Sequence, residues 1–257
     1  MKSRFALASL ALFCVSLSHP AFAGDVAPDT PDTPAMQTPD APDAGDDSPA
    51  MALMKKGDDL FNNKDYAGAE KLYRQAVAQS PDNAQWQVYL GDALYNQDKY
   101  AEAEKCYRIG VKAEPDNAGW QVYLGDALDN ENKYPQAEAV YRVAVRLDPT
   151  NADAVHSLGA VLLEQHKPAP AEPFCRKAVE LEPNNADYQG SLGDALYNQK
   201  KYAASEAPYR AAAHLAPTNA LWQTDLGDAL DKQGKKAEAQ KCYDQAAQLT
   251  KKTAPDG

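Results

Sequence analysis

The sequence predicts an all-α fold: a right-handed α-solenoid of six tandem helix–turn–helix repeats, each 34 residues long. Two observations predict it. Six glycines recur at this interval without a slip, namely Gly57, Gly91, Gly125, Gly159, Gly193 and Gly227. Five prolines do the same, namely Pro81, Pro115, Pro149, Pro183 and Pro217. Self-similarity at a fixed period of this size is the signature of a repeat array.

Each unit contains two stretches with helical spacing of apolar residues. In the second unit, one stripe comprises Trp86, Leu90, Ala93 and Leu94, and the other comprises Ala103, Tyr107 and Val111. The polar stretch 96–99 separates them and predicts a turn. Pro115 disfavours helical geometry at the residue before it, so the unit ends there. The order helix, turn, helix and break then repeats along the chain.

The predicted repeats cover residues 50–83, 84–117, 118–151, 152–185, 186–219 and 220–253, followed by a tail at 254–257. One unit cannot bury the apolar faces of both its helices, so each must stack on its neighbours. A glycine inside a helix costs ~1 kcal/mol relative to alanine. We therefore expect the six recurring glycines to allow close approach of the partner helix.

The frame Leu-Gly, then Tyr, Ala, Tyr and Pro at these offsets resembles the tetratricopeptide repeat over residues 50 to 253. In the second unit it reads Leu90-Gly91, Tyr100, Ala103, Tyr107 and Pro115. The first large aromatic residue lies one place earlier than in the commonest pattern. Repeat 4 departs most, because Pro168 and Cys175 replace its two tyrosines.

The first 23 residues have the pattern of a secretory signal peptide. Lys2 and Arg4 precede the apolar run 5–17, and small residues follow at 21–23. The run is too short for a comfortable membrane span, although an uncleaved anchor stays an alternative. This pattern predicts export, to a bacterial periplasm first and to the extracellular space as the alternative.

Residues 24–50 predict a disordered acidic tether. They contain prolines at 28, 31, 34, 39, 42 and 49 and aspartates at 25, 29, 32, 40, 43, 46 and 47, with no basic residue. Such a segment cannot bury enough apolar surface to fold alone. The whole chain carries a net charge of −11. This charge argues against partners that are nucleic acids or anionic membrane surfaces, and favours basic or neutral peptides.

No enzyme motif is present: there is no phosphate-binding glycine loop, HExxH or GxSxG. We expect no catalysis, no cofactor and no metal site. After the signal segment the cysteines are Cys106, Cys175 and Cys242, too far apart in the array to pair. We expect Cys175 in the core and the other two partly exposed. His156 is the one histidine on the candidate binding stripe, and we expect it to be solvated.

The resemblance implies that first helices line a concave groove whose exposed stripe holds a ligand. In repeat 2 that stripe comprises Gln85, Val88, Tyr89, Asp92, Tyr95 and Asn96, at steps of three and four. The candidate peptide-binding residues are Tyr89, Asp92, Tyr95, Asn96, Tyr123, Asp126, Asn130, Asp194, Tyr197, Asn198 and Asp228. Asp58, Asn62 and Phe61 occupy the corresponding positions of repeat 1. Gripping a C-terminal carboxylate needs basic residues here, and only Lys55 and Lys232 approach the stripe.

These residues favour a non-catalytic protein-interaction scaffold that binds an extended peptide or protein segment in cell-envelope assembly. Aspartate and asparagine can bond a peptide backbone or a basic side chain, and tyrosine is common at interfaces. Two alternatives stay open: a structural spacer whose groove is passive because the ladders reflect duplication, and a glycan-binding envelope protein. We expect a monomer, with end-to-end self-association as the alternative.

Repeat 4 interrupts the stripe and carries Pro170 at the start of its second helix and Pro173 further in. An interior proline removes a helical hydrogen bond and bends the helix. We therefore expect a weak junction at 166–176 that divides the groove into two segments.

Overall fold

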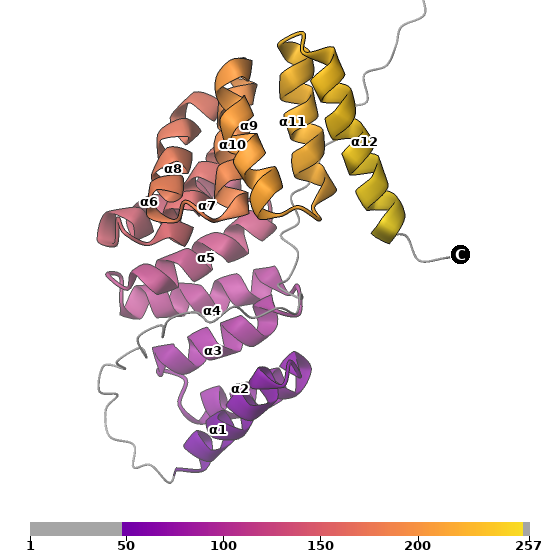
Figure 1. The fold of residues 1–257 in the computed structure, drawn as a ribbon. Coiled ribbons are helices and arrows are strands. Elements are labelled where there is room, and N and C mark those ends of the chain that lie inside the picture. Colours follow the sequence, from indigo (N-terminus) through magenta and orange to yellow (C-terminus); the bar gives the residue numbers. More distant parts are fainter. Residues whose placement is uncertain (1–47, 254–257) are drawn as a thin grey trace, which may run out of the picture. The chain divides into compact units, whose positions relative to one another are not determined.

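The computed structural model describes residues 48–253, and all regular structure in that range is helical (Figure 1). The helices are α1 (Pro49–Asn62), α2 (Tyr66–Gln79), α3 (Ala84–Tyr95), α4 (Tyr100–Ala113), α5 (Ala118–Asn130), α6 (Tyr134–Leu147), α7 (Ala152–Glu164), α8 (Pro168–Leu181), α9 (Ala186–Asn198), α10 (Tyr202–Leu215), α11 (Ala220–Lys232) and α12 (Lys236–Thr253). Each pair packs together and against the next pair in chain order. The predicted all-α repeat solenoid is confirmed.

The signal segment 1–23, the predicted tether as far as residue 47 and the tail 254–257 lie outside the described residues. The end of the predicted tether is helical, because α1 begins at Pro49. The Ser48 side chain accepts the N–H of Met51 at 3.1 Å, and proline is favoured in the first turn of a helix. No helix in residues 48–253 is long and apolar enough to cross a membrane.

The start of each later first helix is fixed by an asparagine cap. The side-chain oxygen of each cap accepts hydrogen bonds from backbone N–H groups of the first turn, at 2.9–3.3 Å. The capping residues are Asn83, Asn117, Asn151, Asn185 and Asn219. These bonds satisfy donors that the helix itself cannot satisfy. The recurring Pro-x-Asn sequence therefore ends one repeat and starts the next.

The turn inside each repeat contains one residue with a left-handed backbone. These residues are Lys64, Asp98, Asn132, His166, Lys200 and Gly234, with φ between 57° and 78°. They fall at the same position of every repeat, where the first helix ends and the chain reverses. Glycine adopts this conformation at no steric cost, and repeat 6 alone has one there.

The recurring glycines lie against the second helix of their own repeat. A Cβ on Gly91 would lie 2.7 Å from the Tyr107 ring, and one on Gly227 would lie 2.6 Å from the Tyr243 ring. Real Cβ contacts are not this short, so alanine would force the helices apart. In repeat 4 the neighbour of Gly159 is the sulfur of Cys175. The predicted packing role of these glycines is confirmed.

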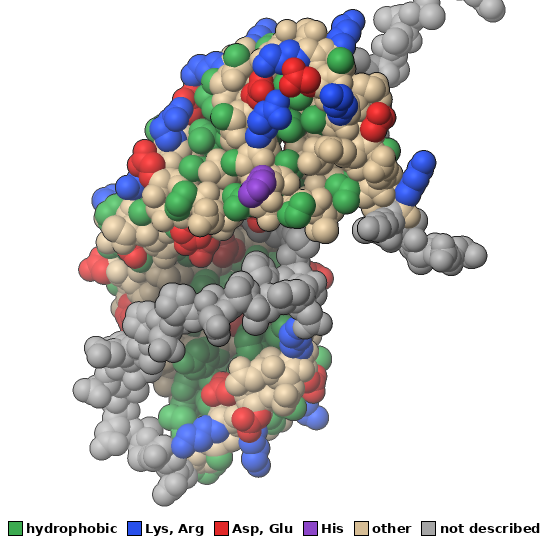
Figure 2. All heavy atoms as spheres, in the orientation of Figure 1, with side chains coloured by type: hydrophobic (Ala, Val, Ile, Leu, Met, Phe, Trp, Pro, Cys, Tyr) green, Lys and Arg blue, Asp and Glu red, His purple; other side chains and the backbone are tan. Residues whose placement is uncertain are grey.

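A polar cluster, here called the junction clasp, joins each repeat to the next. Its centre is a glutamate of the second helix: Glu70, Glu104, Glu138, Glu172 or Glu206. Each glutamate forms an ion pair with a lysine from the turn of the following repeat, at 2.6–3.0 Å, and another with an arginine of its own helix, at 2.6–2.9 Å. In Figure 2, blue basic side chains gather at the top of the view, over the part of the array that contains α8 to α12.

The hydrogen bonds of the clasps outweigh the opposing effect of burial on the central glutamates. They hold the pKa of all five near 2, below the ordinary value of 4.5. Four of the five clasps also contain a glutamine amide, from Gln97, Gln165, Gln199 or Gln233, which donates to the glutamate at 2.9–3.1 Å. Glu131 occupies this position between repeats 2 and 3, and its Oε1 atom is buried without a partner.

Repeat 4 is not an interruption of the core. Helix α8 continues through Pro173, and one cluster of buried residues runs from Ala50 in α1 to Leu196 in α9. Whether the junction at 166–176 is weak stays a prediction. Cys175 is fully buried, as expected. The expected partial exposure of Cys106 and Cys242 is wrong, since both are 7% exposed. Cys106 is covered because its Cβ packs against Gly91.

Candidate functional site

The aspartates of the predicted binding stripe bond to tyrosines of their own repeats. In five repeats a tyrosine of the second helix donates its hydroxyl to the aspartate that follows the recurring glycine, at 2.6–2.8 Å. We call this the Tyr–Asp pair: Tyr73–Asp58, Tyr107–Asp92, Tyr141–Asp126, Tyr209–Asp194 and Tyr243–Asp228. The tyrosines sit over the recurring glycines, so the pair joins both helices of a repeat.

The Tyr–Asp pair gives these aspartates a structural role that the sequence analysis missed. Burial raises the pKa of Asp92 and of Asp194 to about 6, and the tyrosine hydrogen bond offsets only part of this shift. A signal was present in the sequence: repeat 4 lacks both partners, with Ala160 and Cys175 in their places. Each hydroxyl bonds only Oδ1, so the pair does not use the whole carboxylate.

The predicted tyrosines of repeats 2 and 3 lie next to these pairs. Tyr89 is half-buried, with its ring 6.3 Å from that of Tyr73, and Tyr123 lies 5.8 Å from Tyr107. Burial raises the pKa of the Tyr123 hydroxyl, with further contributions from Asp92 and Asp126. These side chains therefore form one aromatic and acidic surface across neighbouring repeats.

The predicted asparagines behave differently from one another. Asn130 donates to the Tyr95 hydroxyl of the preceding repeat at 2.8 Å, which connects two predicted residues across a junction. Asn96 is exposed and donates to the backbone oxygen of Asp92 in its own helix. Asn198 is exposed. The expectation for Val88 is wrong: it is buried against Gly110 of α4 and lies off the stripe's surface.

A second acidic group lies in repeats 5 and 6. It contains Asp194, Tyr197 and Asp228, which belong to the predicted set, together with Asp225 of α11, which does not. Burial raises the pKa of Asp225 to about 8, assisted by the charges of Asp194 and Asp228. The repeat register could have identified it, because Asp225 occupies the position of Tyr89 and Tyr123.

Repeat 4 separates the two groups. His156 is half-buried, in contrast to the solvated side chain that we expected. Its ring stacks on Tyr188 with centroids 4.5 Å apart, and its Nε2 lies 2.9 Å from the Ser191 hydroxyl. Tyr188 in turn donates to Asp153. Here the aromatic ring comes from repeat 5 and covers the stripe of repeat 4.

A cleft opens on the predicted stripe between repeats 1 and 2. Its volume is about 280 Å³, and its walls are Asp58, Phe61, Asn62, Tyr73, Tyr89 and Asp92. Within residues 48–253, Asp58 and Asp92 have no ion pair with a basic side chain, and the Oδ2 atom of each accepts no hydrogen bond. The cleft thus combines three aromatic rings with two carboxylates that lack a cation.

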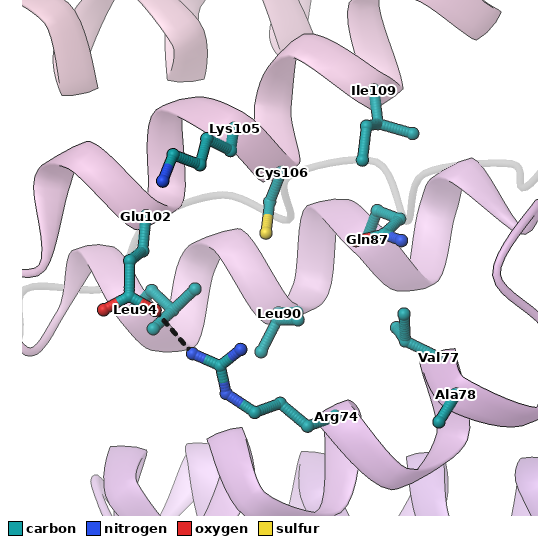
Figure 3. A pocket seen from close by; sticks show the side chains of 10 residues that line it. All are labelled: Arg74, Val77, Ala78, Gln87, Leu90, Leu94, Glu102, Lys105, Cys106 and Ile109. Carbon is teal, nitrogen blue, oxygen red and sulfur yellow. Dashed lines mark hydrogen bonds and ion pairs between the residues drawn. The ribbon is translucent and has the colours of Figure 1, made fainter.

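A larger cavity, about 410 Å³, lies between α2 and α4 over α3 (Figure 3). Its apolar lining includes Leu90, Leu94 and Ile109, and the last is 41% exposed. Arg74 and Glu102 bond across it at 2.7 Å. Burial raises the pKa of the Cys106 thiol in this cavity to about 11, so it is a poor nucleophile at neutral pH. Among the described residues, no group of His, Cys, Asp or Glu could hold a metal ion.

Comparison with known proteins identifies the repeat. Models described as Tetratricopeptide repeat match residues 54–104, 90–152, 156–220 and 223–253, well over half of the chain. No protein with curated function matches the chain.

Three solved structures illustrate the fold similarity. PilF of Pseudomonas aeruginosa has a TM-score of 0.67 at 20% identity, covering 81% of this chain and 93% of that one. MamA from Desulfovibrio magneticus RS-1 has a TM-score of 0.64 at 20% identity, covering 67% and 97%. YrrB, described as a TPR protein with an unusual peptide-binding site, has a TM-score of 0.60 at 20% identity, covering 69% and 91%. At this identity the similarity establishes the fold alone, and the matched repeats establish that the chain belongs to the tetratricopeptide repeat family.

Proposed function

We propose that this chain is a non-catalytic scaffold that holds an extended peptide or protein segment against the first helices of its repeats. Tetratricopeptide repeat proteins bind protein or peptide partners, and the family is generally non-catalytic. The observation that carries the proposal is the open cleft on the predicted stripe, with Tyr89 and Asp92 in its wall. The acidic surface favours basic or neutral segments, because complementary charge steers association.

The signal-peptide pattern supports placing this work outside the cytoplasm, in a bacterial periplasm, where the scaffold would serve cell-envelope assembly. The excess of acidic residues supports partners other than nucleic acids and anionic membranes. We also propose a monomer. Helix α12 has 18 residues, and its outer face is rich in exposed polar side chains, which suits the end of an array.

The passive spacer has one specific observation in its favour. The Tyr–Asp pairs explain the recurring aspartates by packing alone. A binding test must therefore leave these pairs intact. Replacing aspartates by alanine would leave tyrosine hydroxyls without an acceptor, and any loss of binding could then come from loss of structure.

The test is a peptide array of synthetic 12-residue segments that vary in charge, probed with the whole chain. The variant Tyr89→Ala, Tyr123→Ala removes exposed parts of the predicted surface and keeps every Tyr–Asp pair. The matched control, Val77→Ala with Ile109→Ala, alters the cavity of Figure 3. Binding lost only in the tyrosine variant supports the proposal. Binding lost only in the control places the site in the other cavity, and no binding by the wild type favours the spacer.

A further inference from the structure

The cleft between repeats 1 and 2 has the chemistry of a pocket for one cationic side chain. We propose that it receives the lysine side chain of a bound peptide, with the ammonium group between Asp58 and Asp92 and the aliphatic stem against Phe61, Tyr73 and Tyr89. This inference deepens the proposed function and rests on it, because it assigns a residue type to one position of the bound segment.

The size of the cleft suits one side chain. A water molecule occupies about 30 Å³ in the liquid, so 280 Å³ corresponds to about nine waters. Sites for drug-sized molecules begin at about 300 Å³ and usually extend well beyond that size. The rest of a peptide would therefore lie outside the cleft, along the stripe of repeats 2 and 3.

The charge of the cleft favours a cation. Both carboxylates are short of partners, since each receives one tyrosine hydroxyl on Oδ1 and neither forms an ion pair with a basic side chain of residues 48–253. Elsewhere in the array, partly buried glutamates are paired with lysine and arginine in the junction clasps. The rings of Phe61, Tyr73 and Tyr89 add the negative faces that attract ammonium groups.

The geometry of the acceptors favours lysine over arginine. Each tyrosine hydroxyl already occupies one oxygen of its aspartate. A guanidinium binds best to both oxygens of one carboxylate at once, which is harder here. An ammonium can donate to three separate acceptors. Asp58, Asp92 and the side-chain oxygen of Asn62 supply three such partners from two neighbouring first helices.

The pocket should weaken in acid. Burial raises the pKa of Asp92 to about 6, and burial also raises the pKa of Asp58. A cation binds the ionised carboxylate, so the fraction of competent protein falls as the pH drops below 6. The tyrosine and cysteine groups near Asp92 stay neutral in this range, because burial raises the pKa of Tyr73, Cys106, Tyr107 and Tyr123. Asp58, the second carboxylate of the cleft, also loses its charge in acid, which weakens the pocket in the same direction. We expect lysine binding to be about tenfold weaker at pH 5 than at pH 7.5.

The experiment titrates blocked pentapeptides of alanine with one central lysine, arginine or norleucine into the ¹⁵N-labelled whole chain, followed by NMR. We expect the lysine peptide to shift the signals of Asn62 and Tyr89 and to bind at least tenfold more tightly than the norleucine peptide. Arginine should fall between them. In Asp92→Asn the tyrosine keeps its acceptor while the charge is lost, and the preference for lysine should disappear.

Asp194→Asn is the matched control, because it alters the same kind of Tyr–Asp pair in repeat 5 and leaves the cleft untouched. It should retain the lysine preference. Equal binding of lysine and norleucine peptides on the stripe would overturn this inference and leave the scaffold proposal standing. A lysine preference retained in Asp92→Asn, or absence of lysine binding at millimolar concentration, would also overturn it. Far-UV circular dichroism shows whether each variant is folded.

Discussion

The clasp between repeats 2 and 3 contains the clearest local defect of the array. Lys133 bonds both Glu104 and Glu131, at 2.6 and 3.0 Å, and Oε1 of Glu131 is buried without a partner. At the equivalent position of the other clasps, a glutamine donates to the central glutamate and to a backbone oxygen of its own helix, as Gln165 does. We predict that Glu131→Gln stabilises the protein at neutral pH.

The magnitude follows from the bonds involved. A buried acceptor without a partner costs about 1–3 kcal/mol, and a hydrogen bond to a charged group contributes about 1.5–3 kcal/mol. Against this stands the lost contact with Lys133, whose side chain is exposed, and an exposed ion pair of this kind contributes little to stability. The first two figures describe the same repaired contact, so only one of them counts, and we expect a net gain of about 1–2 kcal/mol in the free energy of unfolding. The Tm should then rise by about 2–4 °C for each kcal/mol.

The assay is thermal and urea unfolding by circular dichroism, with hydrogen exchange of α5 and α6 as a local measure, because long repeat arrays depart from two-state unfolding. Gln165→Glu, at the next junction, creates the same defect and serves as the reciprocal variant. It should lose about what Glu131→Gln gains. An unchanged or lower Tm for Glu131→Gln, or the absence of a cost for Gln165→Glu, would refute the reasoning.

Three further predictions concern stability. Gly91→Ala should destabilise the protein by about 1–3 kcal/mol, because the new Cβ would overpack the core. Gly119→Ala should stabilise it by up to ~1 kcal/mol, because there the new Cβ meets nothing closer than 3.4 Å. Equal urea midpoints for the two variants would contradict this prediction. Pro173→Ala should restore a hydrogen bond in α8 and raise the Tm, and slower hydrogen exchange across 166–176 would confirm it. Stability should pass through a maximum near pH 4–5. The clasp glutamates, with pKa lowered from 4.5 to about 2, stabilise the fold above pH 4.5 and lose this effect as pH falls toward 2. The pKa of Asp92 is raised from 3.8 to about 6, so the folded protein binds more protons than the unfolded chain, and stability falls as the pH rises from about 4 to 6. In Asp92→Asn the urea midpoint should depend less on pH over this range. An unchanged slope of the urea midpoint against pH would contradict the prediction.

The fold could be predicted in detail because each position of the repeat occurs several times along the chain with similar residues. The turn after Asn96, the break at Pro115 and the packing of Gly91 recur in register, so one unit confirms the others. The stripe could be placed on the first helix by spacing alone. Helical spacing, however, does not say how deep a side chain lies. Val88 and Tyr89 are neighbours on the chain, yet one is buried and the other is half-buried.

The pairs and clasps could not be predicted in the same way. Tyr107 lies 15 residues after Asp92, and Lys99 lies 29 residues after Glu70. Their meeting depends on the angle at which helices pack, which local sequence does not set. The turn at 96–99 was identified as polar, but polarity fits a solvated turn equally well. Only the packed array shows that Lys99 and Gln97 bond the preceding repeat.

The two roles of the stripe aspartates are compatible, and their chemistry bears on the choice between scaffold and spacer. Packing requires only an acceptor for the tyrosine hydroxyl, and the side-chain oxygen of asparagine would supply one without burying a charge. At Asp92 and Asp194 the carboxylate instead reduces stability above pH 4, since burial raises the pKa. Duplication explains why the residue recurs, but it supplies no stabilising role for the charge. A cationic partner would supply such a role. On binding it would lower the pKa values of Asp92 and Asp194, and the complex would regain the stability that the ionised carboxylates remove from the free protein.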